Sequence, residues 1–420
     1  MMNELSISNA LTKRSQTDAS TVISRNHCED DTAKQQPSIN NKCADNYEIS
    51  ILANSGDDCD KENNPSQPMK NVEINQNNRQ MNQSKSTEHT GNSNNININE
   101  SLKNNEILLG KFFETFELPV LQTIKSGDFS RKQNYISRPG DIIVVGPMKA
   151  GTTWVQHILH QLRTGGDMSF TDIYDVTWWL PYFFQPSDID FTRDQITSPR
   201  ILKSHDPYPF APKGPGIKYV FITRNECDVL WSTMRFINSL YGIDGNNAIS
   251  EALMTFQMES QTNKLIGGME IVASWYDHRN DPDVLWLHYD DLQKDLATCI
   301  KEIAKFVEIP ADDDLLTTIE KQSTFEFMKQ HKNKFLSEKS NIGAILRIDN
   351  FAPKFGTVRP DGGKIGEGVR EIMKSPRLQE ALRKNWNSTI LKASGHRNYD
   401  DFYEDCSLLN RLYKTIGKAE

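Results

Sequence analysis

A short buried strand, followed at once by a glycine-containing loop and an amphipathic helix, constrains the fold of this chain more than any other feature. Residues 141–145, DIIVV, form an apolar and β-branched run that is typical of a strand buried in a parallel sheet. Residues 152–164 carry apolar side chains at the spacing of one helix face, and Gly165-Gly166 ends this pattern. The unit predicts an α/β fold with a central parallel sheet.

The alternation of short strands and helices continues along the chain. Helical patterns follow several of the strands, as successive units of a parallel sheet require. We therefore predict a single domain over residues 105–420, with helices flanking the sheet and a P-loop-like turn after its first strand. The further expected strands are 200–203, 218–223 and 284–288, and the further expected helices are 226–238, 249–267 and 295–307.

Residues 1–104 differ in composition from the rest of the chain. Residues 1–100 contain 19 asparagines and one aromatic side chain, Tyr47. Such a segment buries too little apolar surface to offset its conformational entropy, so we predict a disordered, Asn-rich tail. Its composition favours an inert extension over a regulatory arm. Order is expected to begin near Glu106, where the aromatic stretch 107–124 packs on the edge of the domain.

Charge and composition argue against several classes of protein. The net charge of −8 disfavours nucleic-acid binding through the overall field, although a local basic pocket is compatible with it. The apolar runs are far shorter than the roughly 18–20 residues that cross a bilayer, and residues 1–25 lack the apolar core of a secretory signal. The six cysteines show no CxxC spacing, which favours reduced thiols and a cytoplasmic location.

The loop between the first strand and its helix carries the strongest chemical signal. Its sequence GPMKAGTTW, residues 146–154, directs backbone N–H groups and the positive end of a helix toward one point, which favours an anion. Lys149 adds charge, and Gly151 lets the backbone approach closely. Thr152 and Thr153 add hydroxyl groups.

The position of the lysine separates this loop from a Walker A loop. In that motif a lysine directly precedes the Ser/Thr, whereas Gly151 stands there in this chain and Lys149 lies inside the loop. This difference argues against the interpretation of the chain as a P-loop nucleotide kinase. The kinase remains one alternative, and a non-catalytic nucleotide-binding protein of the same fold is another.

The loop resembles the PKxGTTW-type loop of the cytosolic sulfotransferases, with an additional Met where the family has a direct Pro-Lys pair. The resemblance extends from about Arg138 to the C-terminal helices and does not include the tail. It implies transfer of a sulfuryl group from PAPS (3′-phosphoadenosine 5′-phosphosulfate) to a hydroxyl or an amine of a small-molecule acceptor, with PAP (3′-phosphoadenosine 5′-phosphate) as product. The residues implied to hold the phosphosulfate are Lys149, Ala150, Gly151, Thr152, Thr153 and Trp154.

The run KSH, residues 203–205, ends a predicted strand, where side chains of an open α/β sheet face the ligand crevice. Histidine titrates near neutral pH and can accept a proton there. The run resembles the K-[ST]-H-x-P strand end of the family, which implies that His205 is the catalytic base. Lys203 and Lys149 are then implied to stabilise the transferring group. Asp206 replaces the usual Leu, and this acidic neighbour is expected to raise the pKa of His205 or to alter acceptor contacts.

Three later elements, residues 224–232, 288–292 and 323–328, resemble the parts of the family that bind the nucleotide. Residues 224–232 resemble an RNxxDVxxS element, which implies that Arg224 and Ser232 bind the 3′-phosphate of the donor. Asp228 in the same run is interpreted as a structural residue at a helix start. The residues implied to surround the adenine are Tyr289, Phe325 and Met328, with Ser323 nearby.

Residues 358–366, VRPDGGKIG, stand where the family has an R-K-G-x-x-G-[DN]-W loop. The resemblance implies that Arg359 binds phosphate and that Lys364 replaces the missing second charge. The Trp of the family pattern is absent here.

The aromatic stretch 177–184, TWWLPYFF, is expected to line the acceptor pocket, which favours an apolar or aromatic acceptor. No Cys/His/Asp cluster has the spacing of a metal site, so no metal is expected. The dimerisation pattern of the family is not recognisable, and the oligomeric state is left open.

Overall fold

Five parallel strands form the sheet of the computed structural model, which describes residues 135–180, 190–240, 254–255, 258, 267–336, 358 and 363–416. The predicted tail, the stretch 107–124 and most of the predicted helix 249–267 lie outside these residues. The strands are β1 (Ile142–Val145), β2 (Trp178–Trp179), β3 (Ile201–Ser204), β4 (Lys218–Thr223) and β5 (Val284–His288).

The strand order in the sheet is β2-β3-β1-β4-β5, and every neighbouring pair is parallel. β1 lies in the middle, with β3 on one side and β4 on the other. In an open parallel sheet, such a change of direction leaves a crevice at the carboxyl ends of the central strands. The predicted α/β fold with a central parallel sheet is confirmed.

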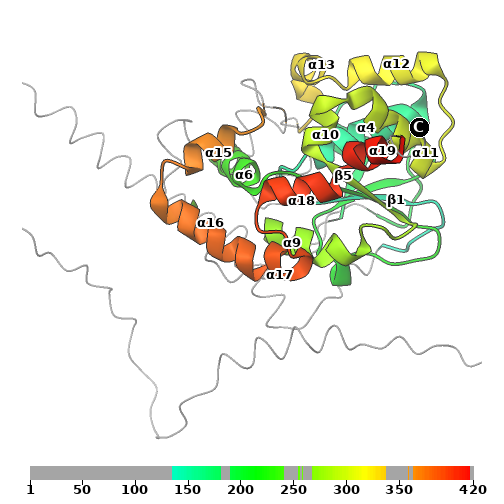
Figure 1. Cartoon of the computed structure of the whole chain (residues 1–420). Helices are drawn as coiled ribbons and strands as arrows, with labels where there is room; N and C mark the ends of the chain where they lie inside the picture. Colours follow the sequence, from blue (N-terminus) through cyan, green and yellow to red (C-terminus); the bar gives the residue numbers. More distant parts are fainter. Residues whose placement is uncertain are drawn as a thin grey trace, which may run out of the picture. The chain divides into compact units, whose positions relative to one another are not determined.

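Helices cover the sheet from both sides (Figure 1). One group consists of α4 (Thr152–Thr164), α11 (Leu296–Val307), α12 (Asp313–Gln322) and α19 (Leu408–Ile416). On the other side lie α9 (Gly268–Trp275) and α17 (Ile390–Ser394), and α16 (Pro376–Ser388) packs on α17. The other helices are α5 (Ile173–Val176), α6 (Glu226–Leu240), α10 (Tyr289–Lys294), α13 (Phe325–Gln330), α15 (Glu367–Ile372) and α18 (Tyr399–Cys406), with 3₁₀ turns at Tyr208–Phe210, Tyr276–His278 and Lys332–Lys334.

The elements nearest the predicted site agree well with the sequence. α4 has the predicted bounds, and β1 and β3 differ from theirs by one residue. The residues of β1 are all buried, which is why an uninterrupted β-branched run marks this central strand. α4 ends at Gly165, whose φ of 68° is the left-handed conformation that glycine adopts without steric cost.

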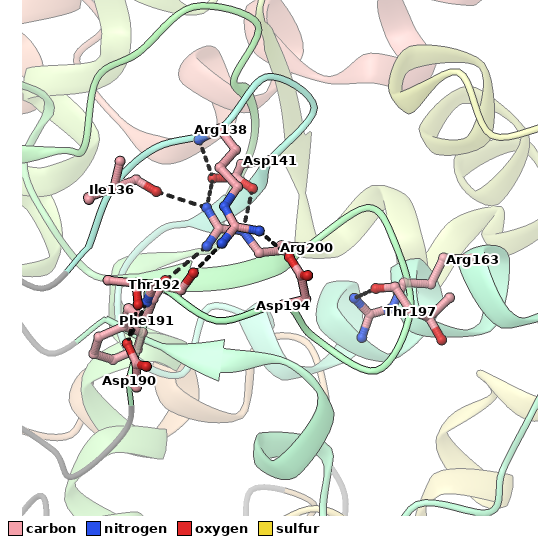
Figure 2. A network of polar contacts seen from close by, with 10 residues as sticks. All are labelled: Ile136, Arg138, Asp141, Arg163, Asp190, Phe191, Thr192, Asp194, Thr197 and Arg200. Carbon is pink, nitrogen blue, oxygen red and sulfur yellow. Dashed lines mark hydrogen bonds and ion pairs between the residues drawn. The ribbon is translucent and has the colours of Figure 1, made fainter. Parts of the chain in front are cut away.

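An ion pair joins the amino ends of β1 and β3 (Figure 2). The Arg200 guanidinium donates to both oxygens of Asp141, with N–O distances of 2.8 and 2.6 Å, and both side chains are buried. The Tyr135 hydroxyl and the Arg138 backbone N–H donate to the same carboxylate at 2.7 and 2.9 Å. Because this network satisfies the buried charges, it holds β1 and β3 together at their amino ends, away from the crevice at the carboxyl ends.

Three cysteines fall within the described residues. Cys227, Cys299 and Cys406 are buried and free. A cytoplasmic location stays a prediction. Among the described residues, no helix combines the length and the apolar character that crossing a membrane requires.

Candidate active site

A cavity opens at the carboxyl ends of the strands, and the segments that follow four of them contribute to its wall. The loop after β1, His205 after β3, Arg224 after β4 and Tyr289 after β5 all line it. The topology therefore brings together motifs that lie far apart in the sequence. The lining residues are Met148, Lys149, Gly151, Thr152, Thr153, Trp154, Tyr174, Trp179, Lys203, His205, Arg224, Ser232, Phe236, Tyr289, Phe325, Met328, Leu336, Val358 and Gly363.

The loop after β1 has a backbone that requires glycine at two positions. A Cβ on Gly146 would lie 2.1 Å from the carbonyl oxygen of Ile222 in β4. Gly151 has φ 112°, and a Cβ there would lie 3.0 Å from side-chain atoms of both Ile222 and Tyr289. The two glycines let the loop pack directly on β4 and start α4 at Thr152.

The amino end of α4 is suited to an anion. Gly151 is its N-cap residue and provides no side-chain cap, and its first turn holds no acidic residue. The first N–H groups of a helix have no partner within the helix, and together with the helix dipole they favour a negatively charged group. Thr152 and Thr153, the first two residues of α4, both line the cavity. The phosphate loop therefore has the placement that its sequence predicts.

Two lysines bring positive charge to the cavity. Lys149 adopts φ 65°, and its Nζ lies 4.4 Å from the ring centre of Phe236 in α6. Lys203 is buried, and its Nζ donates to the Tyr174 hydroxyl at 2.8 Å. Within the described part of the chain, no carboxylate forms an ion pair with Lys203. A buried ammonium without a counter-charge favours binding of an anion beside it.

The tautomer of His205 follows from its hydrogen bond. Nδ1 lies 2.6 Å from the carbonyl oxygen of Gly146, and because a carbonyl only accepts, Nδ1 carries the hydrogen and Nε2 keeps its lone pair. Burial is the main cause that lowers the pKa of His205, and together with the positive charges of Lys203 and Lys149 it brings this pKa to about 3. The imidazole is therefore neutral at pH 7, as a general base must be before it accepts a proton.

The expectation that Asp206 raises the pKa of His205 is wrong, whereas its expected effect on acceptor contacts stays a prediction. The carboxylate of Asp206 is buried and accepts a hydrogen bond from the Ser204 hydroxyl. The Trp275 indole donates to the backbone carbonyl of Asp206 at 3.0 Å. Because the side chain turns into the core, it does not raise the pKa of its neighbour, which burial and two lysines lower.

Three of the residues predicted around the adenine, Tyr289, Phe325 and Met328, line the cavity wall together with Trp154 of the phosphate loop. The rings of Trp154 and Tyr289 meet edge to face with centroids 5.5 Å apart. Phe325 and Met328 lie three residues apart on α13, which places them on one helix face, and both line the cavity. Ser323 is fully buried and lies behind this wall, where its carbonyl accepts a hydrogen bond of 2.7 Å from the Trp154 indole.

Arg224 and Ser232 occupy the remaining side of the cavity, at the end of β4 and on α6. The guanidinium of Arg224 lies 4.2 Å from the ring centre of Tyr289 and 3.4 Å from a carboxylate oxygen of Asp228. Its Nε is buried and has no hydrogen-bond partner among the described residues. An unpaired buried donor costs free energy unless water or a ligand supplies an acceptor.

Asp228 has a larger role than a helix start. Its carboxylate accepts hydrogen bonds from the backbone N–H groups of Gly366 and Gly368 at 2.8 and 2.6 Å. It thereby joins α6 to the start of α15 and to the loop that brings Gly363 into the cavity wall. The Gly363 carbonyl accepts from the Tyr289 hydroxyl at 3.1 Å.

The remaining predicted residues divide into three cases. Arg359 lies outside the described residues. Lys364 is exposed, and its backbone carbonyl lies 3.4 Å from the Arg224 guanidinium. Ala150 is buried in the loop and does not line the cavity.

The aromatic stretch contributes to the cavity through one tryptophan. Trp179 lines it, with its ring centroid 5.8 Å from that of His205. Trp178 points elsewhere and packs on Phe191, and residues 181–184 lie outside the described ranges. Sequence reasoning missed six lining residues, namely Met148, Tyr174, Phe236, Leu336, Val358 and Gly363.

A group with metal-ligand chemistry lies outside the cavity. One ligand atom from each of His396, Asp405 and Cys406 falls within 4.8 Å of the others. Arg279 and Arg411 lie close enough to counter the rise in the pKa of the Cys406 thiol that burial causes. Their positive charge opposes a divalent cation at this point.

Comparisons with known proteins match this chain to one family. The model of the family described as "Sulfotransferase domain" matches residues 139–352. Amine sulfotransferase of Oryctolagus cuniculus is 30% identical over 224 residues, which cover 50% of this chain and 72% of the relative. Sulfotransferase 4A1 of Homo sapiens is 27% identical over 241 residues, which cover 56% of this chain and 80% of the relative. Among solved structures, retinol dehydratase in a complex with retinol and PAP superposes with a TM-score of 0.49 at 20% identity, covering 63% of this chain and 86% of that one.

Proposed function

Because this chain belongs to the sulfotransferase family, we propose that it transfers a sulfuryl group from PAPS to a hydroxyl or an amine of a small-molecule acceptor. One observation carries the proposal. Lys149, Lys203 and a neutral His205 meet in one cavity at the amino end of α4. A binding protein needs cations and a helix end for an anion, but it has no chemical need for a base beside them.

The described residues fit a phosphorylated adenine nucleotide. The uncapped end of α4 and Lys149 suit the 5′-phosphosulfate. Arg224, whose Nε lacks a partner among the described residues, and Ser232 suit the 3′-phosphate. The side chains that suit the adenine are those of Trp154, Tyr289, Phe325 and Met328.

The transfer itself needs a base and a clamp for negative charge. His205 would take the acceptor proton at Nε2 while the acceptor oxygen or nitrogen bonds to sulfur. The bond between sulfur and the bridging phosphate oxygen breaks, and PAP leaves with the electron pair. Lys203 and Lys149 would stabilise the charge that spreads over the sulfonyl and leaving oxygens. Positioning and such fixed charges are the expected sources of rate.

The acceptor side of the cavity favours an apolar or aromatic molecule. Tyr174, Trp179 and Phe236 lie around the two lysines, with Lys203 Nζ 5.4 Å from the Trp179 ring centre. Flat rings of this kind bury an apolar acceptor while leaving its hydroxyl or amine near His205.

Incubating the full chain with ³⁵S-labelled PAPS should label at least one class among phenols, aliphatic alcohols and amines. A parallel reaction with γ-³²P-labelled ATP tests the kinase alternative. Transfer of ³²P without transfer of ³⁵S would overturn the proposal. Tight PAP binding with no labelled product from any class would instead favour a non-catalytic nucleotide-binding protein.

Arg224→Ala should weaken PAP binding by about 10–150-fold, because it removes a charge-assisted contact of about 1.5–3 kcal/mol. The loss should be much smaller for adenosine 5′-phosphate, which lacks the 3′-phosphate. Calorimetry with both ligands measures the difference. Arg359→Ala is expected to behave in the same way.

A matched control for this variant is Arg235→Ala. Arg235 lies on α6 and forms an ion pair with Glu367, outside the cavity lining. Loss of the Arg235 side chain should change neither the affinity for PAP nor that for adenosine 5′-phosphate. Equal losses for PAP and adenosine 5′-phosphate in Arg224→Ala would show that Arg224 does not recognise the 3′-phosphate.

A shortened chain that begins at Ser101 should keep its turnover per folded molecule, because all proposed site residues lie beyond residue 138. Active-site titration with PAP gives the folded fraction, and the ³⁵S assay gives the rate. A loss of more than tenfold with unchanged PAP binding would show that residues 1–100 take part in the reaction.

A further inference from the structure

Tyr174 lies between the donor loop and Lys203, and neither the motifs nor the resemblance assigned it a role. Its hydroxyl accepts a hydrogen bond of 2.8 Å from Lys203 Nζ and lies 3.3 Å from Thr153 Oγ1 in the first turn of α4. The side chain is buried and lines the cavity. One phenol oxygen therefore connects a residue of the phosphate loop to the lysine beside the base.

The short helix α5 holds Tyr174 rigidly. The Asp172 carboxylate accepts from the Tyr174 backbone N–H at 2.9 Å and forms a capping box with Asp175. Gln156 of α4 donates to the Thr177 hydroxyl at 2.8 Å, which ties α5 to the helix of the phosphate loop. The phenol thus moves with the donor-binding helix.

Lys203 depends on this phenol for its position. A lysine side chain has several rotatable bonds, and fixing them costs conformational entropy. Lys203 is buried beside Trp179 and, among the described residues, has no carboxylate partner. The Tyr174 hydroxyl is the acceptor of its one side-chain hydrogen bond within that part of the chain. An ammonium can only donate, so the phenol must use its lone pair here and direct its own hydrogen elsewhere.

We propose that Tyr174 is a positioning residue that holds the Lys203 ammonium where the sulfuryl group is transferred. The inference rests on the proposed function, in which Lys203 stabilises that group. Because Thr153 and α5 fix the phenol relative to α4, the distance between the donor loop and the Lys203 charge stays constant. Such preorganisation lowers the barrier without strengthening binding of the product.

Tyr174→Phe removes the hydroxyl and leaves the ring in place. We expect kcat to fall about 10–100-fold, the effect of losing a hydrogen bond to a charged group. PAP affinity should change by less than about threefold, because PAP lacks the sulfuryl group. In a Lys203→Met background the same substitution should lower kcat by less than about threefold, since the two residues then act as one unit. Equal losses in both backgrounds would overturn the proposal.

Two further measurements separate this inference from the proposed function. Reductive methylation read by mass spectrometry should modify Lys203 several-fold faster in Tyr174→Phe, whether or not the protein transfers sulfate. Faster methylation without any transfer by the unmodified chain would contradict the proposed function and support the positioning. Unchanged methylation would overturn the positioning, whatever the rate of transfer.

The matched control is Tyr219→Phe. Tyr219 is a buried tyrosine of β4 whose hydroxyl donates to the Pro212 carbonyl, away from the cavity lining. It should leave kcat and the methylation of Lys203 unchanged. A fall in kcat equal to that of Tyr174→Phe would show that losing any buried phenol hydroxyl suffices, and would overturn the proposal.

Discussion

Replacing His205 by alanine is expected to lower kcat by about 10²–10⁴-fold, the usual contribution of a positioned general base. PAP affinity should stay almost unchanged, because the residue acts on the acceptor proton and not on the nucleotide. A strongly acidic phenol, which is already partly ionised, should lose less rate than an aliphatic alcohol. The ³⁵S assay with both acceptors, together with PAP calorimetry, measures all three.

His205→Asn separates catalysis from structure. An asparagine amide can still donate to the Gly146 carbonyl, as Nδ1 of His205 does, but it has no basic nitrogen in place of Nε2. It should therefore be as slow as the alanine variant. The control variant is His278→Ala. His278 pairs with Asp281 and does not line the cavity, so this variant should be fully active. If either His205 variant keeps more than a tenth of the kcat with an alcohol, His205 is structural.

The pH dependence of the rate follows from the same histidine. Its pKa is lowered to about 3 by burial and by Lys203 and Lys149, so the active neutral form is present above that value and is lost as the pH falls through it. The negative charges of bound PAPS oppose the lysines and raise the pKa in the complex. The acid limb of the kcat profile should therefore lie between about pH 3 and 6.5. An acid limb above 6.5 would contradict a neutral, half-buried imidazole whose pKa is lowered.

Local patterns predicted the parts of the fold that local sequence determines. The bounds of α4 follow from its apolar spacing and from Gly165, and the central strand follows from its β-branched run. β2 was not predicted, because its two residues are too few to show the alternation of apolar and polar side chains that marks a strand. α9 at Gly268–Trp275 was not predicted as a separate helix, because its pattern adjoins the expected helix 249–267.

The composition of the site was predictable where a motif carries it and not where only the tertiary structure does. Lys203 and His205 end a strand, and their placement in the crevice follows from the topology. Asp228 accepts from Gly366 and Gly368, about 140 residues further along the chain, so its neighbours gave no sign of that bond. The predicted effect of Asp206 on the pKa of His205 failed because proximity in sequence does not determine the direction of a side chain at a strand end.

The second large effect is expected from Lys203→Met, which keeps most of the side-chain length and removes the charge. Loss of one fixed group that stabilises transition-state charge typically costs about 10²–10³-fold in kcat. PAP affinity should change little, because the ammonium acts on the sulfuryl group that PAP lacks. Single-turnover transfer of ³⁵S from bound PAPS measures the chemical step directly.

Lys218→Met provides the control for loss of one positive charge. Lys218 begins β4, at the opposite end of the sheet from the cavity, and donates to the Phe306 carbonyl at 2.8 Å. If a change in net charge alone mattered, the two variants would lose rate equally. We expect only Lys203→Met to do so, because buried charge acts over short distances where no water screens it. A weakening of PAP binding as large as the fall in single-turnover rate would instead place Lys203 in ground-state binding of the nucleotide, and His205 would then act without this clamp.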